Sequence, residues 1–127
     1  MGATAGGLVT QKCPLKFVAQ GIRSVAPPIF APLTADGNGT ILPSQYAINA
    51  KAAGLDIIAW SLERSGILAD GNNGFYYQSF DSAITRKSDV MRVLDALGVL
   101  AKQVGIIGIF SDWPATTTFY ANCAGIK

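Results

Sequence analysis

The sequence predicts an α/β fold with parallel strands, and two observations lead to that prediction. Three apolar runs, at 24–30, 55–62 and 106–112, alternate with stretches of helical spacing. The second and third runs are almost continuously apolar, which is typical of parallel strands buried on both faces. Strands that alternate with helices form right-handed crossovers and a parallel sheet. The expected order is therefore β-α-β-α-β-α.

Local signals mark the ends of the first expected helix, over 45–53. Ser44 precedes it with a hydroxyl suited to capping the first turn. Gly54 follows it, where a left-handed residue commonly ends a helix.

The second expected helix, over 89–103, shows the clearest amphipathic pattern. Either Ser88 or Thr85 is placed to cap it, and Gly105 is placed to end it. Its apolar stripe consists of Val90, Val93, Leu94, Leu97, Leu100 and Ala101.

A third, shorter helix is expected after Pro114, because proline suits the first helical position. The residue directly before this helix is expected to be either Asp112 or Trp113. Asp112 is placed to accept hydrogen bonds from the free N–H groups of that helix.

The composition indicates one globular domain. Of the 127 residues, 50% are hydrophobic and 14% are charged, which argues against disorder. No apolar run approaches the roughly 20 residues of a membrane-spanning helix. Residues 1–14 have neither the apolar core nor the basic start of a signal peptide, so none is expected in this chain. The net charge is +2 with scattered Lys and Arg, so no nucleic-acid partner is expected.

The chain contains no histidine and two cysteines. The missing histidine removes the commonest general acid/base and metal ligand, and no zinc spacing is present. Cys13 and Cys123 lie near opposite ends, where two interpretations stay open: one long-range disulfide, or two small apolar side chains.

The stretch "LTADGNGTILPSQY" resembles the middle of an EF-hand calcium loop, but a glycine-rich turn is the better interpretation. In the EF-hand register Thr34 and Gln45 occupy the first and last ligand positions, where carboxylates are needed. The prolines before it also exclude the preceding helix. Asn38-Gly39-Thr40 is in addition an N-glycosylation acceptor, meaningful only in a secreted eukaryotic protein.

The candidate site lies at the end of the second strand, where "IIAWSLER" places Trp60, Ser61, Glu63 and Arg64. In parallel α/β folds this end of the sheet carries the active-site groups. Judged without any resemblance, Trp60 is better explained by core packing than by ligand contact, and Glu63-Arg64 is best explained as a solvated ion pair.

A loop of roughly twenty residues follows, over 68–89, and contains four aromatic residues. Loops of this length are usually functional or disordered, and aromatics argue against disorder. It is expected either to cover a pocket or to pack on a part of the fold outside this chain. The aromatic residues are Phe75, Tyr76, Tyr77 and Phe80.

Two stretches, "AAGLDIIAWSL" (52–62) and "VGIIGIFSDWPATTTFYAN" (104–122), carry a resemblance to a known family. They resemble the glycerophosphodiester phosphodiesterase family, whose fold is a TIM barrel. The first stretch is similar to its seventh strand, and the second to its eighth, which often reads "GVDGIFTDFP". The segment 24–54 resembles the sixth strand with its turn and helix. The resemblance covers about 20–123. It implies the C-terminal segment, about strands 6–8 with their helices, of a TIM (β/α)8 barrel.

The resemblance implies a division into a partly flexible lead-in (1–19) and a partial phosphodiesterase-like domain (20–127). The intact enzyme would be a hydrolase of lipid metabolism that uses Ca²⁺ or Mg²⁺ to convert glycerophosphodiesters to an alcohol and glycerol 3-phosphate. Trp60 corresponds to the aromatic residue that lines the substrate pocket, and Asp112 and Trp113 to the end of strand eight. These three are the expected substrate-binding residues. The compartment of the parent stays open.

The family's catalytic residues have no counterpart here. Members carry two histidines as acid and base and carboxylates that hold the metal, all upstream of the matched strands. We therefore expect no catalysis and no bound metal for this chain alone. The alternative function is a non-catalytic relic or assembly module. Since three parallel strands leave two unpaired edges, self-association through those edges is also expected.

Overall fold

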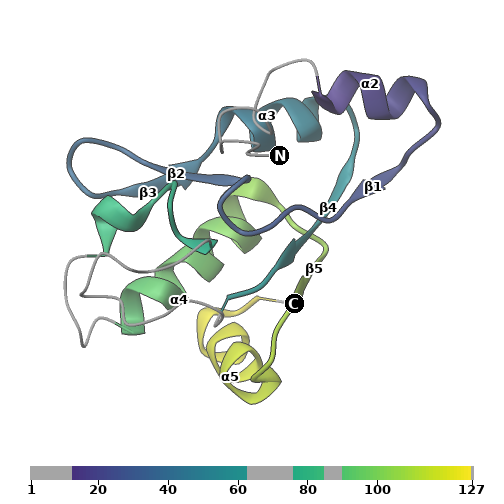
Figure 1. Cartoon of the computed structure of the whole chain (residues 1–127). Coiled ribbons are helices and arrows are strands. Elements are labelled where there is room, and N and C mark those ends of the chain that lie inside the picture. The colour runs from purple at the N-terminus through teal and green to yellow at the C-terminus, as the bar shows by residue number, and fades with distance from the viewer. Residues whose placement is uncertain (1–12, 63–75, 85–89, 127) are drawn as a thin grey trace.

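The computed structural model describes residues 13–62, 76–84 and 90–126 (Figure 1). In chain order the elements are α2 (Cys13–Ala19), β1 (Ser24–Val25), β2 (Leu33–Ala35), β3 (Ile41–Pro43), α3 (Gln45–Ala52), β4 (Asp56–Trp60), the 3₁₀ turn η3 (Asp81–Ala83), α4 (Val90–Val99), the π-helical turn η4 (Leu100–Val104), β5 (Gly108–Phe110) and α5 (Pro114–Ala124). None of the helices within these ranges has the length and apolar character to cross a membrane.

The predicted parallel sheet is confirmed. Its order is β1-β4-β5, and both pairs of neighbouring strands are parallel. The strands of this sheet therefore lie side by side in chain order. The crossover from β1 to β4 contains the β2–β3 hairpin and α3, and the crossover from β4 to β5 contains α4 and η4.

The first strand is shorter than the predicted 24–30, because Pro27 and Pro28 have no N–H to donate to a sheet ladder. Pairing with β4 nevertheless continues beyond Val25. The Trp60 N–H donates to the Pro27 carbonyl at 3.3 Å, and the Ile29 N–H donates to the Trp60 carbonyl at 2.6 Å. The prolines thus reduce the strand to an interrupted ladder without removing it from the sheet.

Local capping signals were predicted correctly at α3. The Ser44 hydroxyl accepts a hydrogen bond from the Ala47 N–H at 3.2 Å. Gly54, with φ of +78°, follows the helix in the left-handed conformation. Gly105 plays the same role at the end of η4, with φ of +73°. The cap predicted at Ser88 or Thr85 lies outside the described residues.

Helix α2 and the hairpin of β2 and β3 were not predicted. Helix α2 occupies the second half of the expected lead-in, and its Phe17 packs against the main core. The hairpin flanks the glycine-rich turn with strands, so the EF-hand geometry of two helices is not formed. Asp36 closes this turn, its carboxylate accepting bonds from the N–H groups of Asn38 at 2.9 Å and Thr40 at 2.8 Å.

The two faces of the parallel sheet differ in burial. Ile57 and Ala59 of β4 are fully buried in the cluster formed with helices α3 and α4. The alternate residues Ile58 and Trp60 are half-buried, and Phe110, the register partner of Trp60, is 60% exposed. Because side chains alternate along a strand, the helices cover one face, and the described residues leave the other largely uncovered.

The expectation for the aromatic loop was wrong for Tyr77 and Phe80. Both side chains lie in the chain's own core, with exposed fractions of 1% and 0%. Their ring centroids are 5.2 Å apart, and the Tyr77 hydroxyl donates to the Leu62 carbonyl. They cover neither a pocket nor a part of the fold outside the chain. Phe75 lies outside the described residues.

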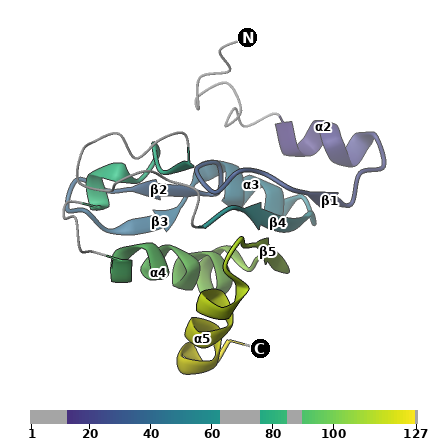
Figure 2. The same ribbon diagram turned by 60° about the horizontal axis from the view of Figure 1, so that its bottom comes forward.

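Helix α5 lies at the periphery of the fold and projects below α4 and β5 in Figure 2. It has no buried residue, and Phe119 is 68% exposed. Its half-buried Tyr120 packs against the core. Cys123 is exposed with a free thiol, so it is neither half of a disulfide nor an apolar core residue in this structure.

Candidate functional site

The candidate site is the carboxyl edge of the parallel sheet. There the strand register places Pro28, Trp60 and Phe110 in one row across the three strands. The chain leaves β5 through Ser111, Asp112 and Trp113 and enters α5 at Pro114. The sequence-predicted residues Trp60, Asp112 and Trp113 therefore share this edge of the sheet.

Trp60 is held in place by two contacts. Its indole N–H donates to the Ala26 carbonyl at 2.7 Å. Its ring meets Tyr76 edge-on, with centroids 5.7 Å apart and an interplanar angle of 73°, an arrangement that aromatic pairs favour. The indole is thus tied to the segment after β1, while part of its surface stays exposed.

Ser61 follows Trp60 and has an unusual environment. The side chain is 8% exposed, and its hydroxyl has no hydrogen-bond partner in the structure described. A buried hydroxyl without a partner costs about 1–3 kcal/mol. This polar atom therefore marks a point on the edge where a ligand or an additional protein segment could supply a bond.

At the end of β5 a serine organises the backbone. The Ser111 hydroxyl accepts hydrogen bonds from the Trp113 N–H at 3.1 Å and from the Thr117 hydroxyl at 3.1 Å. Trp113 is the N-cap residue of α5, and its side chain makes no capping bond. Asp112, predicted to cap this helix, stands one residue before the cap and is exposed.

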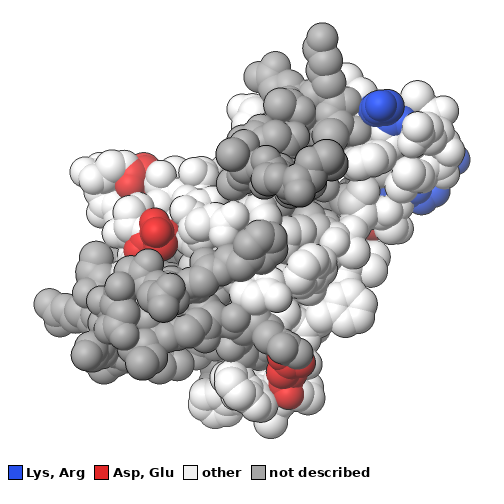
Figure 3. All heavy atoms as spheres, viewed as in Figure 1, with Lys and Arg blue, Asp and Glu red and all other residues white. Residues whose placement is uncertain are grey.

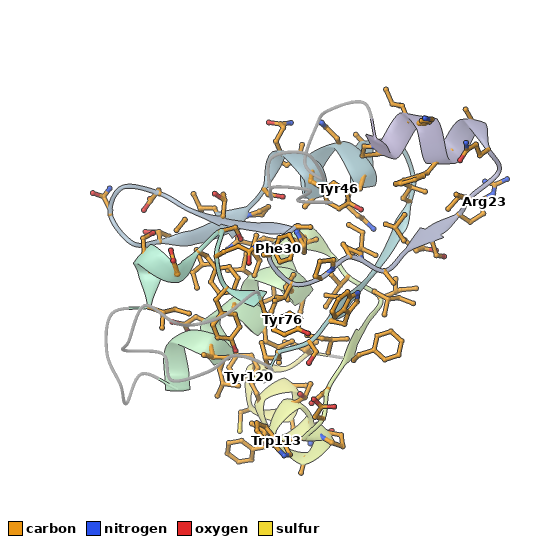
Figure 4. The ribbon with its side chains drawn as sticks, in the orientation of Figure 1. Arg23, Phe30, Tyr46, Tyr76, Trp113 and Tyr120 are labelled. Atoms are coloured by element: carbon orange, nitrogen blue, oxygen red, sulfur yellow. The ribbon has the colours of Figure 1, made fainter. Side chains whose placement is uncertain are left out.

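The edge does not bring all three predicted side chains into one cluster. Trp113 is 61% exposed. In Figure 4 it lies beside α5, whereas Tyr76, the ring that contacts Trp60, lies toward the middle of the molecule. The edge thus has two parts, an ordered Trp60–Tyr76 pair and an open turn at Asp112 and Trp113. Glu63 and Arg64 lie outside the described residues.

Tyr76 and Ser111 belong to the site but were not among the predicted site residues. Tyr76 was predicted only as an aromatic residue of the loop over 68–89, which was expected either to cover a pocket or to pack on a part of the fold outside this chain. The spacing of residues in this loop does not predict that the Tyr76 ring contacts Trp60. Ser111 had a signal, because Ser and Asp at the end of a strand often bond the backbone two residues further on.

Charged groups are sparse at this edge. Asp112 is the described acid that follows a parallel strand, whereas Asp56 begins β4 at the opposite end. In Figure 3 the visible Lys and Arg atoms lie over α2 and β1, and acidic atoms lie over the hairpin and beside α5. Within 13–62, 76–84 and 90–126, no three His, Cys, Asp or Glu side chains gather into a metal-binding group.

An apolar hollow adjoins the edge. It has a volume of about 300 Å³ and is lined by residues of α2, β1 and α3, among them Phe17, Val25 and Tyr46. Ala26, whose carbonyl accepts the hydrogen bond from the Trp60 indole N–H, is another of its lining residues. The wall of this hollow and the orientation of Trp60 are therefore linked through one residue.

Comparison with known proteins finds a longer relative. The chain is 50% identical over 105 residues to a protein named "Extracellular protein" from the fungus Arthroderma benhamiae. The match covers 81% of this chain and 42% of the relative, so the chain spans less than half of that protein's length. No protein-family model matches the chain, and no solved structure matches it.

Proposed function

We propose that the chain is the C-terminal segment of an extracellular glycerophosphodiester phosphodiesterase, contributing strands six to eight of a TIM barrel. One observation carries the proposal: the three parallel strands β1, β4 and β5, which neighbour one another in chain order, have helices on one face and a largely uncovered apolar face on the other. In a TIM barrel the outer face of each strand packs on helices, and the inner face packs on opposing strands. Ile58, Trp60 and Phe110 would be the inward residues.

The position of the candidate residues supports the same assignment. Active sites of TIM barrels lie at the carboxyl ends of the strands, and Trp60, Asp112 and Trp113 lie at that end of β4 and β5. In the intact enzyme Trp60 would form a rigid apolar wall for the substrate, held by Ala26 and Tyr76. Asp112 and Trp113 would contact the substrate at the rim.

The proposed reaction of the intact enzyme is hydrolysis of a glycerophosphodiester. Water adds to phosphorus, the bond from phosphorus to the alcohol oxygen breaks, and the alcohol leaves with a proton, giving glycerol 3-phosphate. The Ca²⁺ or Mg²⁺ of this family would polarise the phosphoryl group. The described residues of this chain do not fit such an ion, since they gather no group of metal ligands. Its ligands, and the acid and base, would come from another segment.

Two features of the relative support the proposal. The relative is long enough to hold further strands, because the matched region is 42% of it. Its name places it outside the cell, which is the basis for proposing an extracellular location here.

The second candidate is a non-catalytic relic or assembly module. Two observations favour it: the sequence contains no histidine, and apolar residues around β5 and α5 are exposed. Such a module would bind the complementary segment without restoring chemistry. The exposed residues that would form the contact are Ile107, Phe110, Trp113 and Phe119.

Complementation distinguishes the two candidates. The chain is assayed for release of glycerol 3-phosphate from glycerophosphocholine with Ca²⁺ or Mg²⁺, alone and co-expressed with the part of the Arthroderma relative that the match leaves out. We expect no turnover alone and turnover in the complex, reduced by Trp60→Ala. A complex without turnover would establish the assembly module instead. Turnover by the repurified chain alone would overturn both.

A further inference from the structure

The turn of the β2–β3 hairpin carries a motif that the proposed phosphodiesterase does not use. Asn38, Gly39 and Thr40 form the pattern Asn-x-Ser/Thr with a residue other than proline in the middle. The remaining asparagines of the chain, at 49, 72, 73 and 122, lack a Ser or Thr two positions later. The 127 residues therefore contain a single acceptor sequence for N-linked glycosylation.

The turn presents this motif to solvent. Asn38 and Thr40 are both exposed, and they lie between the two strands of the hairpin, which extends from the body of the molecule in Figure 1. Gly39, with φ of +75°, sits between them and faces the protein, since a Cβ atom there would lie 3.8 Å from the Ala83 backbone. The body of the protein thus approaches the glycine, and the exposed asparagine remains accessible.

The hydrogen bonds of the turn leave the Asn38 side chain out. Asn38 contributes its backbone N–H, which donates to the Asp36 carboxylate at 2.9 Å. The Thr40 N–H donates to the same carboxylate at 2.8 Å, and the Asp36 N–H donates to the Thr40 carbonyl at 3.0 Å. A substituent on the Asn38 amide would therefore leave these bonds in place.

We propose that Asn38 is a site of N-linked glycosylation. The inference rests on the extracellular location proposed above, because the secretory pathway of a eukaryote supplies the donor, an oligosaccharide linked to a lipid pyrophosphate. The Asn38 amide nitrogen forms a bond to the anomeric carbon of the first sugar and loses one proton. The bond from that carbon to the pyrophosphate oxygen breaks, and the lipid pyrophosphate leaves with the electron pair.

The test is to secrete the full chain from a fungal host behind an added leader and to measure its mass before and after treatment with peptide N-glycosidase. We expect a glycan on the wild-type chain that the enzyme removes. Asn38→Gln and Thr40→Ala should each abolish it, and Thr40→Ser, which preserves the acceptor pattern, should retain it.

Two results would overturn the proposal: a secreted, protease-resistant wild-type chain without glycan, or a glycan that persists in Asn38→Gln. Neither result depends on phosphodiesterase activity. Glycosylated chain that yields no turnover in the complementation assay would leave the glycan assignment standing and remove the catalytic one.

Discussion

The hydroxyl of Tyr120 lies directly over Gly98, 2.7 Å from the position that a Cβ atom on this glycine would take. Gly98 belongs to α4 and Tyr120 to α5. Helix α5 has no buried residue, and Tyr120 is one of its few half-buried side chains. The missing side chain at Gly98 therefore makes room for the contact that joins the last helix to the core.

We expect the effect of Gly98→Ala on the free energy of unfolding to depend strongly on whether Tyr120 is present. In a Tyr120→Ala background the substitution should stabilise the chain by about 0.5–1 kcal/mol, because alanine favours the helix over glycine. With Tyr120 present, the new methyl group displaces the tyrosine, and this gain should shrink or reverse. Thermal or urea unfolding of the four variants measures a coupling free energy of at least about 0.5 kcal/mol. Additive effects would show that Tyr120 does not dock α5 through this position.

Trp60→Phe tests the hydrogen bond that orients the site. The substitution keeps an aromatic ring but removes the donor to the Ala26 carbonyl. We expect the free energy of unfolding to fall by about 0.5–1.5 kcal/mol. Trp113→Phe is the matched control, because Trp113 is 61% exposed and lies on the same edge. Its effect should stay within about 0.5 kcal/mol. Equal losses for both tryptophans would show that the indole N–H of Trp60 contributes nothing.

We expect the β2–β3 hairpin to lose stability in acid, because protonation of the Asp36 carboxylate weakens the hydrogen bonds that close the turn. The backbone N–H of Thr40, opposed by partial desolvation and aided by the Asn38 N–H, lowers the pKa of the Asp36 carboxyl below its ordinary value. A group whose folded pKa is lowered stabilises the fold above its unfolded pKa, and the contribution is lost as the pH falls through the folded pKa. Amide exchange in the hairpin, compared between about pH 6 and about pH 3, should show the loss.

Asp36→Asn is the control for this prediction, because asparagine also closes such turns but does not titrate. The variant should show a smaller change in hairpin protection over the same pH range. Identical pH dependence in both proteins would assign the effect to another group.

The uncovered apolar residues around β5 should make the isolated chain self-associate. Ile107, Phe110 and Phe119 are 61%, 60% and 68% exposed, and burying apolar surface gains about 25 cal/mol per Å². Sedimentation velocity over a concentration series should show oligomers. Phe110→Lys should reduce them, whereas Ile48→Lys, at a 52% exposed position on α3, should not. A monomeric wild-type chain at all concentrations would contradict the prediction.

The sequence predicts those parts of the fold that local signals determine. Ser44 and Gly54 bracket α3 as expected because capping and left-handed backbone depend on neighbouring residues only. The run 55–62 contains β4 because a continuous apolar stretch has few alternatives in an α/β fold. The parallel order follows from the alternation of strands and helices.

Elements stabilised by distant contacts escaped prediction. Helix α2 has no clear helical period, and its Phe17 joins the core that the rest of the chain provides. The aromatic loop gave no indication that Tyr77 would bond the Leu62 carbonyl, because its composition equally suits a lid. At the site the sequence predicted that Trp60, Asp112 and Trp113 lie at the carboxyl ends of parallel strands. The bond from Trp60 to Ala26 was not predicted, since it depends on where the chain after β1 runs beside the end of β4.

The uneven burial of the two sheet faces also has a calorimetric consequence. The heat capacity change of unfolding, about 12–15 cal/mol/K per residue for ordinary domains, arises mainly from apolar surface that becomes hydrated. Surface around Phe110 that is already hydrated in the folded monomer adds nothing to it. The monomeric chain should therefore have a flatter stability curve than a closed domain of its length. Covering that face with a complementary segment would steepen the curve and add a negative heat capacity change of binding.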